Sequence, residues 1–359
     1  MTAQTSALDL LFKPRPTATA RISRLSTRVP MRPLAIGAAM GAALAAAALV
    51  NYGLARRAER KNPPLGRFLD VDGVRLHYLE RGQGTPLVLL HGNGGMIQDF
   101  LSSGLVDRAA RRHRVIVFDR PGYGYSERPR DRIWTPEAQA DLLAKALRRL
   151  RVERATVLGH SWAGGVALAM ADRHPDLVGG LVLEAGYYYP SVRLDVVPMS
   201  MPAVPLLGDI LRHTIAPPLS RLLWPVMMRK IFGPAPMPEK FRAFPREMAV
   251  RPSHLRASSS ETALMIPSAA ARQKSHASLG MPVAIIAGEG DRMVTTADQS
   301  ARLHAEIPHS TFTCLPGTGH MVHHSATGAV LDVIRQVADE QAASSRATSP
   351  SLARLAAEV

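Results

Sequence analysis

The chain has 359 residues, enough for one large hydrophobic core with an inserted subdomain. Its formal net charge of +15 is unevenly distributed: residues 1–62 carry a net +8, residues 186–278 carry a net +7, and the remaining segments cancel. A basic chain can bind nucleic acid, but this one contains no recognised nucleic-acid-binding module and few aromatic residues among its basic ones. We therefore expect no nucleic-acid partner. The single cysteine, Cys314, excludes an internal disulfide.

The first long apolar stretch covers residues 34–55, 22 residues without a charged side chain. A helix of that length spans about 33 Å, enough to cross the hydrocarbon core of a bilayer. Ten of these residues are alanine, so the hydrophobic drive is modest, and Lys and Arg flank both ends, which leaves the orientation open. We predict a single-pass membrane anchor at 34–55, a disordered basic tail at 1–33 before it and a linker at 56–63 after it.

Two other interpretations of this apolar stretch stay open. It could be the apolar part of a secretory signal, above all if translation starts at Met31, because Met31-Arg32, the apolar run and Gly53-Leu54-Ala55 have the three-part layout of such a signal. The protein would then be secreted or periplasmic. It could also be an interfacial or disordered tail. The sequence decides neither the side of the membrane nor the oligomeric state.

From residue 64 onward, short apolar runs alternate with helical patterns. Asp72-Gly73 between two runs is a hairpin signal, and the later runs are continuous, as in strands that are covered on both faces. This alternation predicts an α/β fold with a mostly parallel, doubly wound sheet. The expected strands are 68–71, 74–79, 86–90, 115–118, 157–158, 181–183, 283–286 and 311–315, and the expected helices are 136–150, 166–172, 297–307 and 328–338.

The alternation stops at about residue 187 and resumes near residue 280. The intervening stretch holds thirteen of the 28 prolines and seven of the 15 methionines, with apolar residues at helical spacing. We predict a helical cap insert at 187–279 between two parts of the core, 64–186 and 280–341, and a C-terminal tail at 342–359. A basic, apolar cap could contact anionic lipid, but arginines that only keep an apolar lid soluble would give the same pattern.

The most informative motif is Gly159-His160-Ser161-Trp162-Ala163, which directly follows the apolar run 155–158. A buried strand followed by a serine with small residues two positions before and after it is typical of a nucleophile elbow, a sharp turn in which bulky side chains at those positions would collide. The turn places Ser161 at a helix N-terminus, where free N–H groups stabilise an oxyanion. We expect His160 to pack beneath this turn.

A serine at its free pKa is a poor nucleophile, so Ser161 needs a histidine base and an acid that orients the base. Asp291 and His320 each follow a predicted strand, and open α/β sheets place their sites in such loops. Asp291 is the preferred acid, and Glu184, at the end of another strand, is the fallback. The oxyanion hole is expected from the backbone N–H groups of Asn93 and Trp162.

His323 and His324 follow His320 at a spacing that could hold a metal on a helix face. No further ligands point to a metal, so we expect surface histidines, no metal and no organic cofactor. The three tyrosines at 187–189 stand at the entrance of the cap. They either line a pocket or pack in the core.

In chain order, Ser161, Asp291 and His320 have the arrangement of one known fold. The chain resembles the α/β-hydrolase superfamily, specifically capped members with a His-Gly-x-Gly oxyanion loop, over about residues 64–341. The residues that carry the resemblance are His91-Gly92-Asn93-Gly94-Gly95, Asp119-Arg120-Pro121-Gly122-Tyr123-Gly124-Tyr125-Ser126, Gly159-His160-Ser161-Trp162, Gly288 to Asp291 and Gly319-His320.

The resemblance implies an acyl-enzyme mechanism in which Ser161 attacks, His320 carries the proton and Asp291 holds the imidazole. It also implies that the stretch from Asp119 supports the site without chemistry. A serine at 161 argues against the dehalogenase and epoxide-hydrolase branches, which use aspartate. We predict a membrane-anchored serine hydrolase that cleaves a small or medium apolar ester-like acyl substrate. Perhydrolysis, acyl transfer, C–C bond hydrolysis of a diketone and a non-catalytic binding role stay open.

Overall fold

The computed structural model describes residues 31–272 and 279–348. The chain divides into two units, one up to Ala43 and the other from Leu44 onward. Helix α1 (Met31–Lys61) is long and apolar enough from Ala35 onward to cross a membrane. Most of the predicted basic tail, residues 1–30, lies outside the described residues.

The end of α1 differs from the prediction. We expected a linker at 56–63, but the helix continues through Lys61. The residues from 55 to 61 are Ala, Arg, Glu and Lys, which all favour helix, and the first helix breaker is Pro63. Ala58 in this segment is buried, so the extra turns are part of the packed domain.

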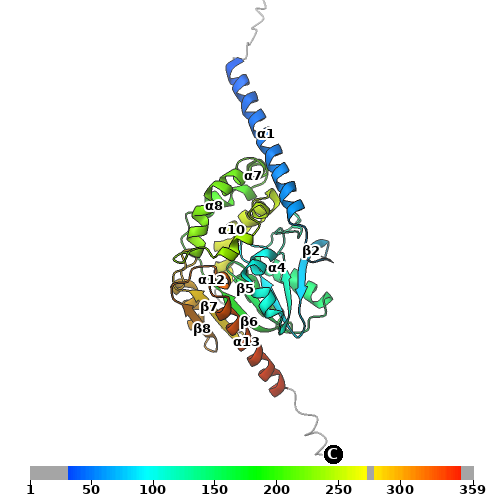
Figure 1. Cartoon of the computed structure of the whole chain (residues 1–359), viewed down its shortest axis with the longest axis vertical. Coiled ribbons are helices and arrows are strands. Elements are labelled where there is room, and N and C mark those ends of the chain that lie inside the picture. Colours follow the sequence, from blue (N-terminus) through cyan, green and yellow to red (C-terminus); the bar gives the residue numbers. More distant parts are fainter. Residues whose placement is uncertain (1–30, 273–278, 349–359) are drawn as a thin grey trace, which may run out of the picture. The chain divides into compact units, whose positions relative to one another are not determined.

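Within the described residues, eight strands form one sheet in the order β1-β2-β4-β3-β5-β6-β7-β8. In Figure 1 this sheet lies below the labelled helices α7, α8 and α10. The β1–β2 and β2–β4 pairs are antiparallel and all the other pairs are parallel, which confirms the predicted α/β class. Asp72 and Gly73, both at positive φ, join β1 to β2 in the predicted two-residue hairpin. The strands are β1 (Arg67–Val71), β2 (Val74–Arg81), β3 (Thr85–Leu90), β4 (His113–Phe118), β5 (Ala155–His160), β6 (Val178–Glu184), β7 (Val283–Gly288) and β8 (Thr311–Leu315).

Helices cover both faces of the sheet. Val88 and Leu90 of β3 pack into one apolar cluster with α4 (Pro136–Arg149) and α5 (Ala163–Arg173). Leu87 and Leu89 pack into a second cluster on the other face. Successive side chains of a strand point to opposite faces, so one continuous apolar run contributes side chains to both clusters. The helices of the second cluster are α2 (Ile97–Ser103), α3 (Leu105–Ala109) and α13 (Thr327–Thr348).

The last helices also extend or break the predicted ranges. α13 continues through Thr348, so the first part of the tail predicted at 342–359 is helical. The helix predicted at 297–307 is a π-helical turn, η4 (Ala297–Ala301), followed by α11 (Arg302–Glu306). A short helix, α12 (Val322–Ser325), follows the loop that carries His320.

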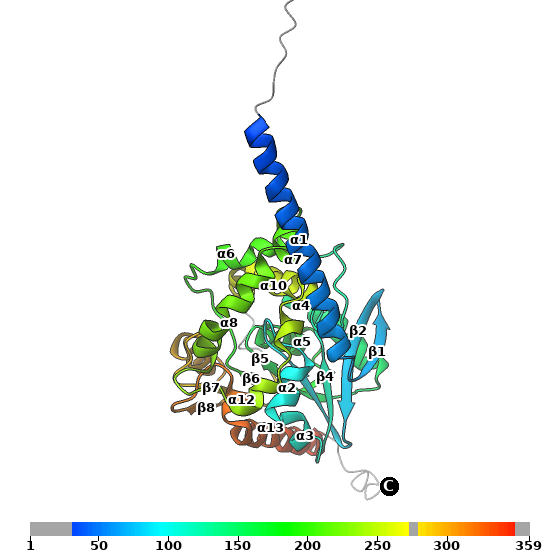
Figure 2. The same ribbon diagram turned by 45° about the horizontal axis from the view of Figure 1, so that its top comes forward.

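The chain between β6 and β7 forms helices, as predicted for the cap. Figure 2 shows α8 on the outside of this insert and α10 nearer the sheet. The cap helices are α6 (Val196–Ser200), η1 (Met201–Ala203), α7 (Leu207–His213), α8 (Ala216–Phe232), η2 (Glu239–Ala243), α9 (Arg246–Ala249) and α10 (Pro252–Arg272).

Candidate active site

Ser161 occupies the turn between β5 and α5. Its φ is 56°, in the left-handed region that non-glycine residues rarely adopt. The N–H of Ser161 donates to the carbonyl oxygen of Glu184 at 2.8 Å, which fixes the turn against the neighbouring strand. A Cβ added to Gly159 would lie 2.5 Å from the carbonyl oxygen of Ala163, so this turn requires glycine there. The geometry is that of a nucleophile elbow.

The structure brings Ser161, His320 and Asp291 together at the carboxyl ends of three strands. His320 Nε2 lies 2.9 Å from Ser161 Oγ, and His320 Nδ1 lies 2.7 Å from Asp291 Oδ2. The other carboxylate oxygen, Oδ1, accepts the N–H groups of Met293 at 2.7 Å and Val294 at 3.0 Å. Burial alone would raise the pKa of Asp291, but the neighbouring His320 and these hydrogen bonds outweigh burial and lower it. The carboxylate is therefore ionised where it contacts the imidazole.

The predicted oxyanion loop packs directly against Ser161. A Cβ on Gly92 would lie 2.9 Å from Ser161 Cβ, so only glycine allows this approach. The side chain of Asn93 points away and is held by the cap: its Nδ2 donates to Thr262 Oγ1 at 3.1 Å and to the carbonyl oxygen of Ser258 at 3.2 Å. Across the described part of the chain, the backbone N–H groups of Asn93 and Trp162 have no hydrogen-bond partner.

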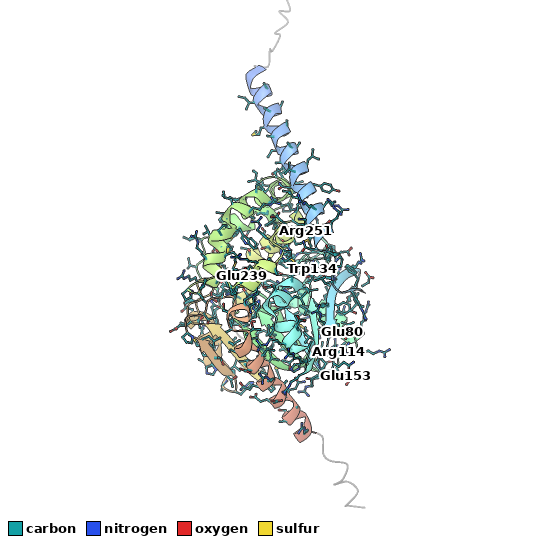
Figure 3. All side chains as sticks on the ribbon, in the orientation of Figure 1. Glu80, Arg114, Trp134, Glu153, Glu239 and Arg251 are labelled. Carbon is teal, nitrogen blue, oxygen red and sulfur yellow. The ribbon has the colours of Figure 1, made fainter. Side chains whose placement is uncertain are left out.

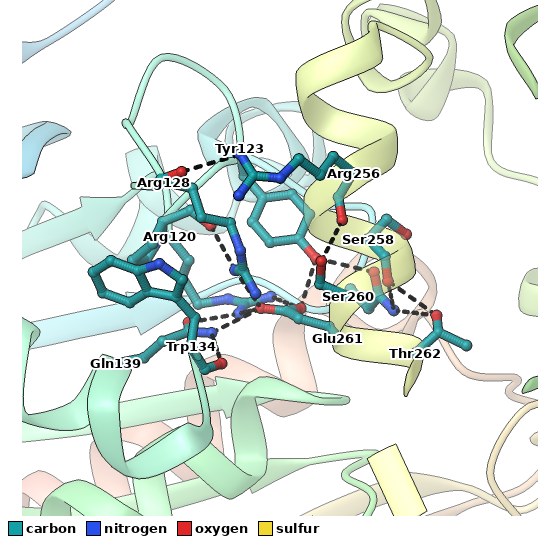
Figure 4. Close-up of polar contacts among 12 residues, drawn as sticks. Arg120, Tyr123, Arg128, Trp134, Gln139, Arg256, Ser258, Ser260, Glu261 and Thr262 are labelled. Atoms are coloured by element: carbon teal, nitrogen blue, oxygen red, sulfur yellow. Dashed lines mark hydrogen bonds and ion pairs between the residues drawn. The ribbon is translucent and has the colours of Figure 1, made fainter. Parts of the chain in front are cut away.

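Arg120, in the loop after β4, joins the oxyanion loop to the cap. Its guanidinium donates to the carbonyl oxygens of His91 at 2.7 Å and Gly92 at 3.0 Å. It also forms a two-pronged ion pair with Glu261 of α10, at 2.5 and 3.0 Å, while Gln139 accepts a further hydrogen bond (Figure 4). Both charged side chains are fully buried. A buried arginine with its donors satisfied in this way holds the backbone of the oxyanion loop in place.

Asp119, the residue before Arg120, has a similar supporting role. Its Oδ1 accepts the N–H of Ile97 at 2.9 Å, and its Oδ2 accepts the N–H of Tyr125 at 3.0 Å. Oδ2 also lies 2.6 Å from His77 Nδ1. These contacts connect the loop after β4 to neighbouring segments of the core.

The prediction that His323 and His324 lie on the surface is wrong, because both are buried. Glu184 also differs from its fallback role, since it contacts His323 and not His320: its Oε1 lies 2.6 Å from His323 Nδ1. The opposite ring nitrogen of His323 lies 3.3 Å from Asp99. Burial would lower the pKa of His323, but these two carboxylates raise it to about 10. The imidazole is therefore a buried cation between two anions.

Ligand atoms of Asp99, His160 and His323 lie within 4.8 Å of one another, which makes them a group that could hold a metal ion. The proton held by His323 competes with a metal at this place, because a ligating histidine must be neutral. His160 packs beneath the elbow as predicted: its Nε2 lies 3.2 Å from the carbonyl oxygen of His320. Burial lowers the pKa of His160 to about 3, so this ring is neutral.

A small hollow of about 20 Å³ lies beside Trp162, the residue after Ser161. Core and cap both contribute to its mostly apolar walls, with Leu168 of α5, Tyr187 and Tyr188 before the cap, and Met265 of α10. The tyrosines are also buried, and Gln299 Oε1 accepts the N–H groups of Tyr188 and Tyr189 at 2.7 and 2.8 Å. This tyrosine segment therefore both lines the hollow and packs in the core.

Comparison with known proteins agrees with this geometry. Residues 85–327 match the family described as alpha/beta hydrolase fold. The chain belongs to this family. A 2-hydroxymuconate semialdehyde hydrolase of Pseudomonas sp. (strain CF600) is 38% identical to this α/β-hydrolase over 144 residues, which are 39% of the chain and 51% of the relative. Haloalkane dehalogenase 2 of Mycobacterium tuberculosis is 30% identical over 149 residues, 41% of the chain and 51% of the relative.

The α/β-hydrolase thus spans about half the length of these curated relatives. A solved structure described as a membrane phospholipase A, a bacterial virulence factor, superposes with a TM-score of 0.59 at 21% identity, and the match covers 87% of this chain and 99% of the other. At that identity the likeness concerns the fold alone.

Sequence reasoning missed Glu261 and the role of His323. Glu261 lies 141 residues from Arg120, in a helix whose pattern shows only that it is a cap element. The available signal was the basic residue of the Asp119-Arg120 motif, which stands before a turn rich in glycine and tyrosine. Nothing local identifies its partner.

Proposed function

We propose that this α/β-hydrolase is a membrane-anchored serine hydrolase that cleaves an apolar ester or related acyl substrate through an acyl-enzyme. The observation that carries the proposal is the continuous contact from Asp291 through His320 to Ser161, with the two distances of 2.7 and 2.9 Å. A serine, a base and an ionised acid in hydrogen-bond contact are the arrangement that activates a hydroxyl nucleophile.

The proposed reaction has two halves. Ser161 Oγ attacks the carbonyl carbon while its proton moves to His320 Nε2, and the oxyanion accepts hydrogen bonds from the N–H groups of Asn93 and Trp162. The leaving alkoxide departs with the proton from His320. Water then loses a proton to His320 and attacks the acyl-enzyme, which releases the acid and restores Ser161. Asp291 keeps Nδ1 of His320 protonated throughout and stabilises the imidazolium.

The mostly apolar residues around the small hollow beside Trp162 support an apolar acyl group as substrate. The length and composition of α1 support the anchor. The likeness in fold to a protein described as a membrane phospholipase is compatible with an enzyme of this kind at a membrane.

A second candidate function is C–C bond hydrolysis, and the observation that favours it is the 38% identity to a 2-hydroxymuconate semialdehyde hydrolase. The same three side chains would serve it, so the substrate decides between the two. Turnover of nitrophenyl esters but not of a ring-cleavage dienoate would support the ester hydrolase. Faster turnover of the dienoate would replace it.

The first experiment is labelling of the full-length protein in detergent with a fluorophosphonate probe. We expect rapid labelling of the wild type, none in Ser161→Ala, and a loss of about 10⁴-fold in rate in His320→Ala. Glu289→Gln is the matched control, because this exposed carboxylate is two residues from Asp291 and should not alter labelling. Labelling that persists in Ser161→Ala would move the nucleophile elsewhere, and a folded wild type that does not react would favour a binding protein.

A further inference from the structure

The outer helices of the cap expose apolar side chains in unusual number. Thirteen of the twenty-one large apolar side chains that are exposed in the described residues lie between residues 192 and 226. Five more lie in α1. We call the exposed side chains of α7 and α8, with those directly before them, the outer cap face: Leu206, Leu207, Ile210, Ile215, Leu219, Leu222, Leu223 and Val226.

Helix α8 is apolar on both sides. Its exposed residues from Ile215 to Val226 recur at spacings of three and four, so they share one face of the helix. The opposite face contains buried Met228 and Phe232, which pack in the cap core. A helix that is apolar all round is normally buried in a protein or in a membrane. In α8, the rest of the protein covers only the side that carries Met228 and Phe232.

The outer cap face also lacks charge. No Asp, Glu, Lys or Arg side chain is fully exposed between residues 196 and 228, all of which the structure describes. The three charged residues in this range have partners: Asp209 and Arg212 pair with each other, and Arg221 Nε lies 2.9 Å from a glutamate of α9. Exposed apolar area of this extent without charge marks an interaction surface.

The middle of α1 indicates what this surface meets. Leu44, Ala47 and Ala48 are half-buried and Asn51 is buried, so one stripe of the helix packs within the same unit as the cap. Asn51 Nδ2 donates to the carbonyl oxygens of His213 at 3.0 Å and Thr214 at 2.9 Å, at the turn between α7 and α8.

Asn51 lies four residues before the end of the apolar stretch of α1, about 6 Å along the helix axis. The α7–α8 turn is therefore level with residues that a membrane-spanning α1 would keep inside the bilayer. Amphipathic helices lie about 5–10 Å into the boundary between headgroups and acyl chains. The exposed apolar side chains beside this turn are at that depth.

Basic residues follow on both elements, at the positions that would face the headgroups. Arg56, Arg57 and Arg60 come directly after the apolar stretch of α1, and Arg229 and Lys230 come directly after the apolar face of α8. All five are exposed. Lys and Arg near a membrane surface attract anionic lipid.

We propose that the outer cap face is a docking surface for an anionic lipid bilayer, the bilayer that α1 enters. The inference rests on the anchor in the proposed function and is independent of the reaction at Ser161. It bears on the question that composition left open, because the exposed face of α7 and α8 up to residue 228 is apolar and the exposed basic residues of α8 come after it.

The test uses the full-length chain in vesicles of phosphatidylcholine and phosphatidylglycerol. The exposed Cys314 is first replaced by serine, and single cysteines are then placed at Leu206, Leu222, Leu49 or Glu153 and labelled with an environment-sensitive fluorophore. Leu206 and Leu222 report on the outer cap face and Leu49 on the anchor. Glu153, labelled in Figure 3 away from the cap helices, is the control. Quenching by spin-labelled lipid and by aqueous iodide is measured at each position.

We expect the labels at Leu206 and Leu222 to be quenched severalfold more by the lipid quencher than the label at Glu153, and severalfold less by iodide. Labels at both cap positions that are as accessible to iodide as the one at Glu153 would overturn the proposal. Protection from iodide without lipid quenching would also overturn it, because a second copy of the chain would then cover the face.

The control positions separate this proposal from the proposed function. Lipid quenching at Leu49 with none at the cap positions would retain the anchor and reject cap docking. No lipid quenching at Leu49 would reject the anchor, and cap docking with it. Fluorophosphonate labelling of Ser161 in the same vesicles tests the hydrolase separately, since neither Leu206 nor Leu222 contributes to the site.

Discussion

The inner and outer sides of the cap are built in opposite ways. On the inner side, α10 contributes Glu261, a fully buried carboxylate paired with Arg120 of the core. On the outer side, α7 and α8 expose leucine, isoleucine and valine and no fully exposed formal charge through residue 228. A soluble lid would normally show the reverse, with apolar residues inside and charges outside.

The difference shows that the two sides serve different needs. A buried ion pair adds little stability compared with an apolar contact. It does fix how the two segments pack, because a buried charge without its partner strongly destabilises the folded state. Arg120 thereby sets the position of α10 relative to the oxyanion loop. The outer apolar side chains do not stabilise the fold while they face water. They would contribute a favourable free energy only if a partner outside the chain buried them.

The largest expected effect comes from breaking the inner side. Glu261→Ala leaves the buried guanidinium of Arg120 unpaired and should lower the free energy of unfolding by about 3–5 kcal/mol, measured by urea titration in detergent. Glu261→Gln keeps the shape and part of the hydrogen bonding and should cost less. A loss below about 1 kcal/mol in the alanine variant would show that the ion pair does not hold the cap.

The next effect concerns the buried imidazolium under the site. His323→Gln removes the hydrogen bond to Glu184 and should cost about 2–3 kcal/mol at pH 7. Folding raises the pKa of His323 above its ordinary value of 6.5, to about 10, so its contribution is full below pH 6.5 and is lost as the pH rises through 10.

Urea titrations from pH 6 to pH 10 check this. The stability of the wild type should fall over that range more steeply than that of His323→Gln, and the two should converge at the alkaline end. Parallel curves would mean that His323 is not protonated in the folded protein.

The smallest effect is expected on the outer side. Leu222→Gln should change the free energy of unfolding in detergent by less than about 0.5 kcal/mol, because the side chain is 74% exposed. Met248→Ala, at a buried position of the same cap, is the control and should cost about 2–5 kcal/mol. An equally large loss at Leu222 would place it in a packed interface and remove the contrast between the two sides.

Most of the sheet and the three candidate catalytic residues could be predicted from sequence because each depends on a local pattern. The apolar run 86–90 is a strand whose side chains pack on both faces of the sheet. Ser161 was identified because the turn requires small residues two positions before and after the serine. Asp291 and His320 were found from their places after predicted strands. The ends of α1 and α13 were less predictable, since helix formers continue past the last apolar turn.

His323 shows where local patterns fail. It lies in α12, three residues after His320, and its buried partners are Glu184 and Asp99, which come from β6 and α2. A histidine spaced three residues from another gives no sign of carboxylates so far away in the chain.

The sequence by itself determined the α/β class, the turn that exposes Ser161 and the order of the three candidate catalytic residues, because strand periodicity and turn sterics act over a few residues. Only the tertiary structure decided which acid contacts His320, that Glu261 pairs with Arg120, and which side of the cap is apolar. Those outcomes depend on the packing of segments that are separate in the chain, 29 residues apart for Asp291 and His320 and 141 for Arg120 and Glu261, and burial decides whether a charge needs a partner.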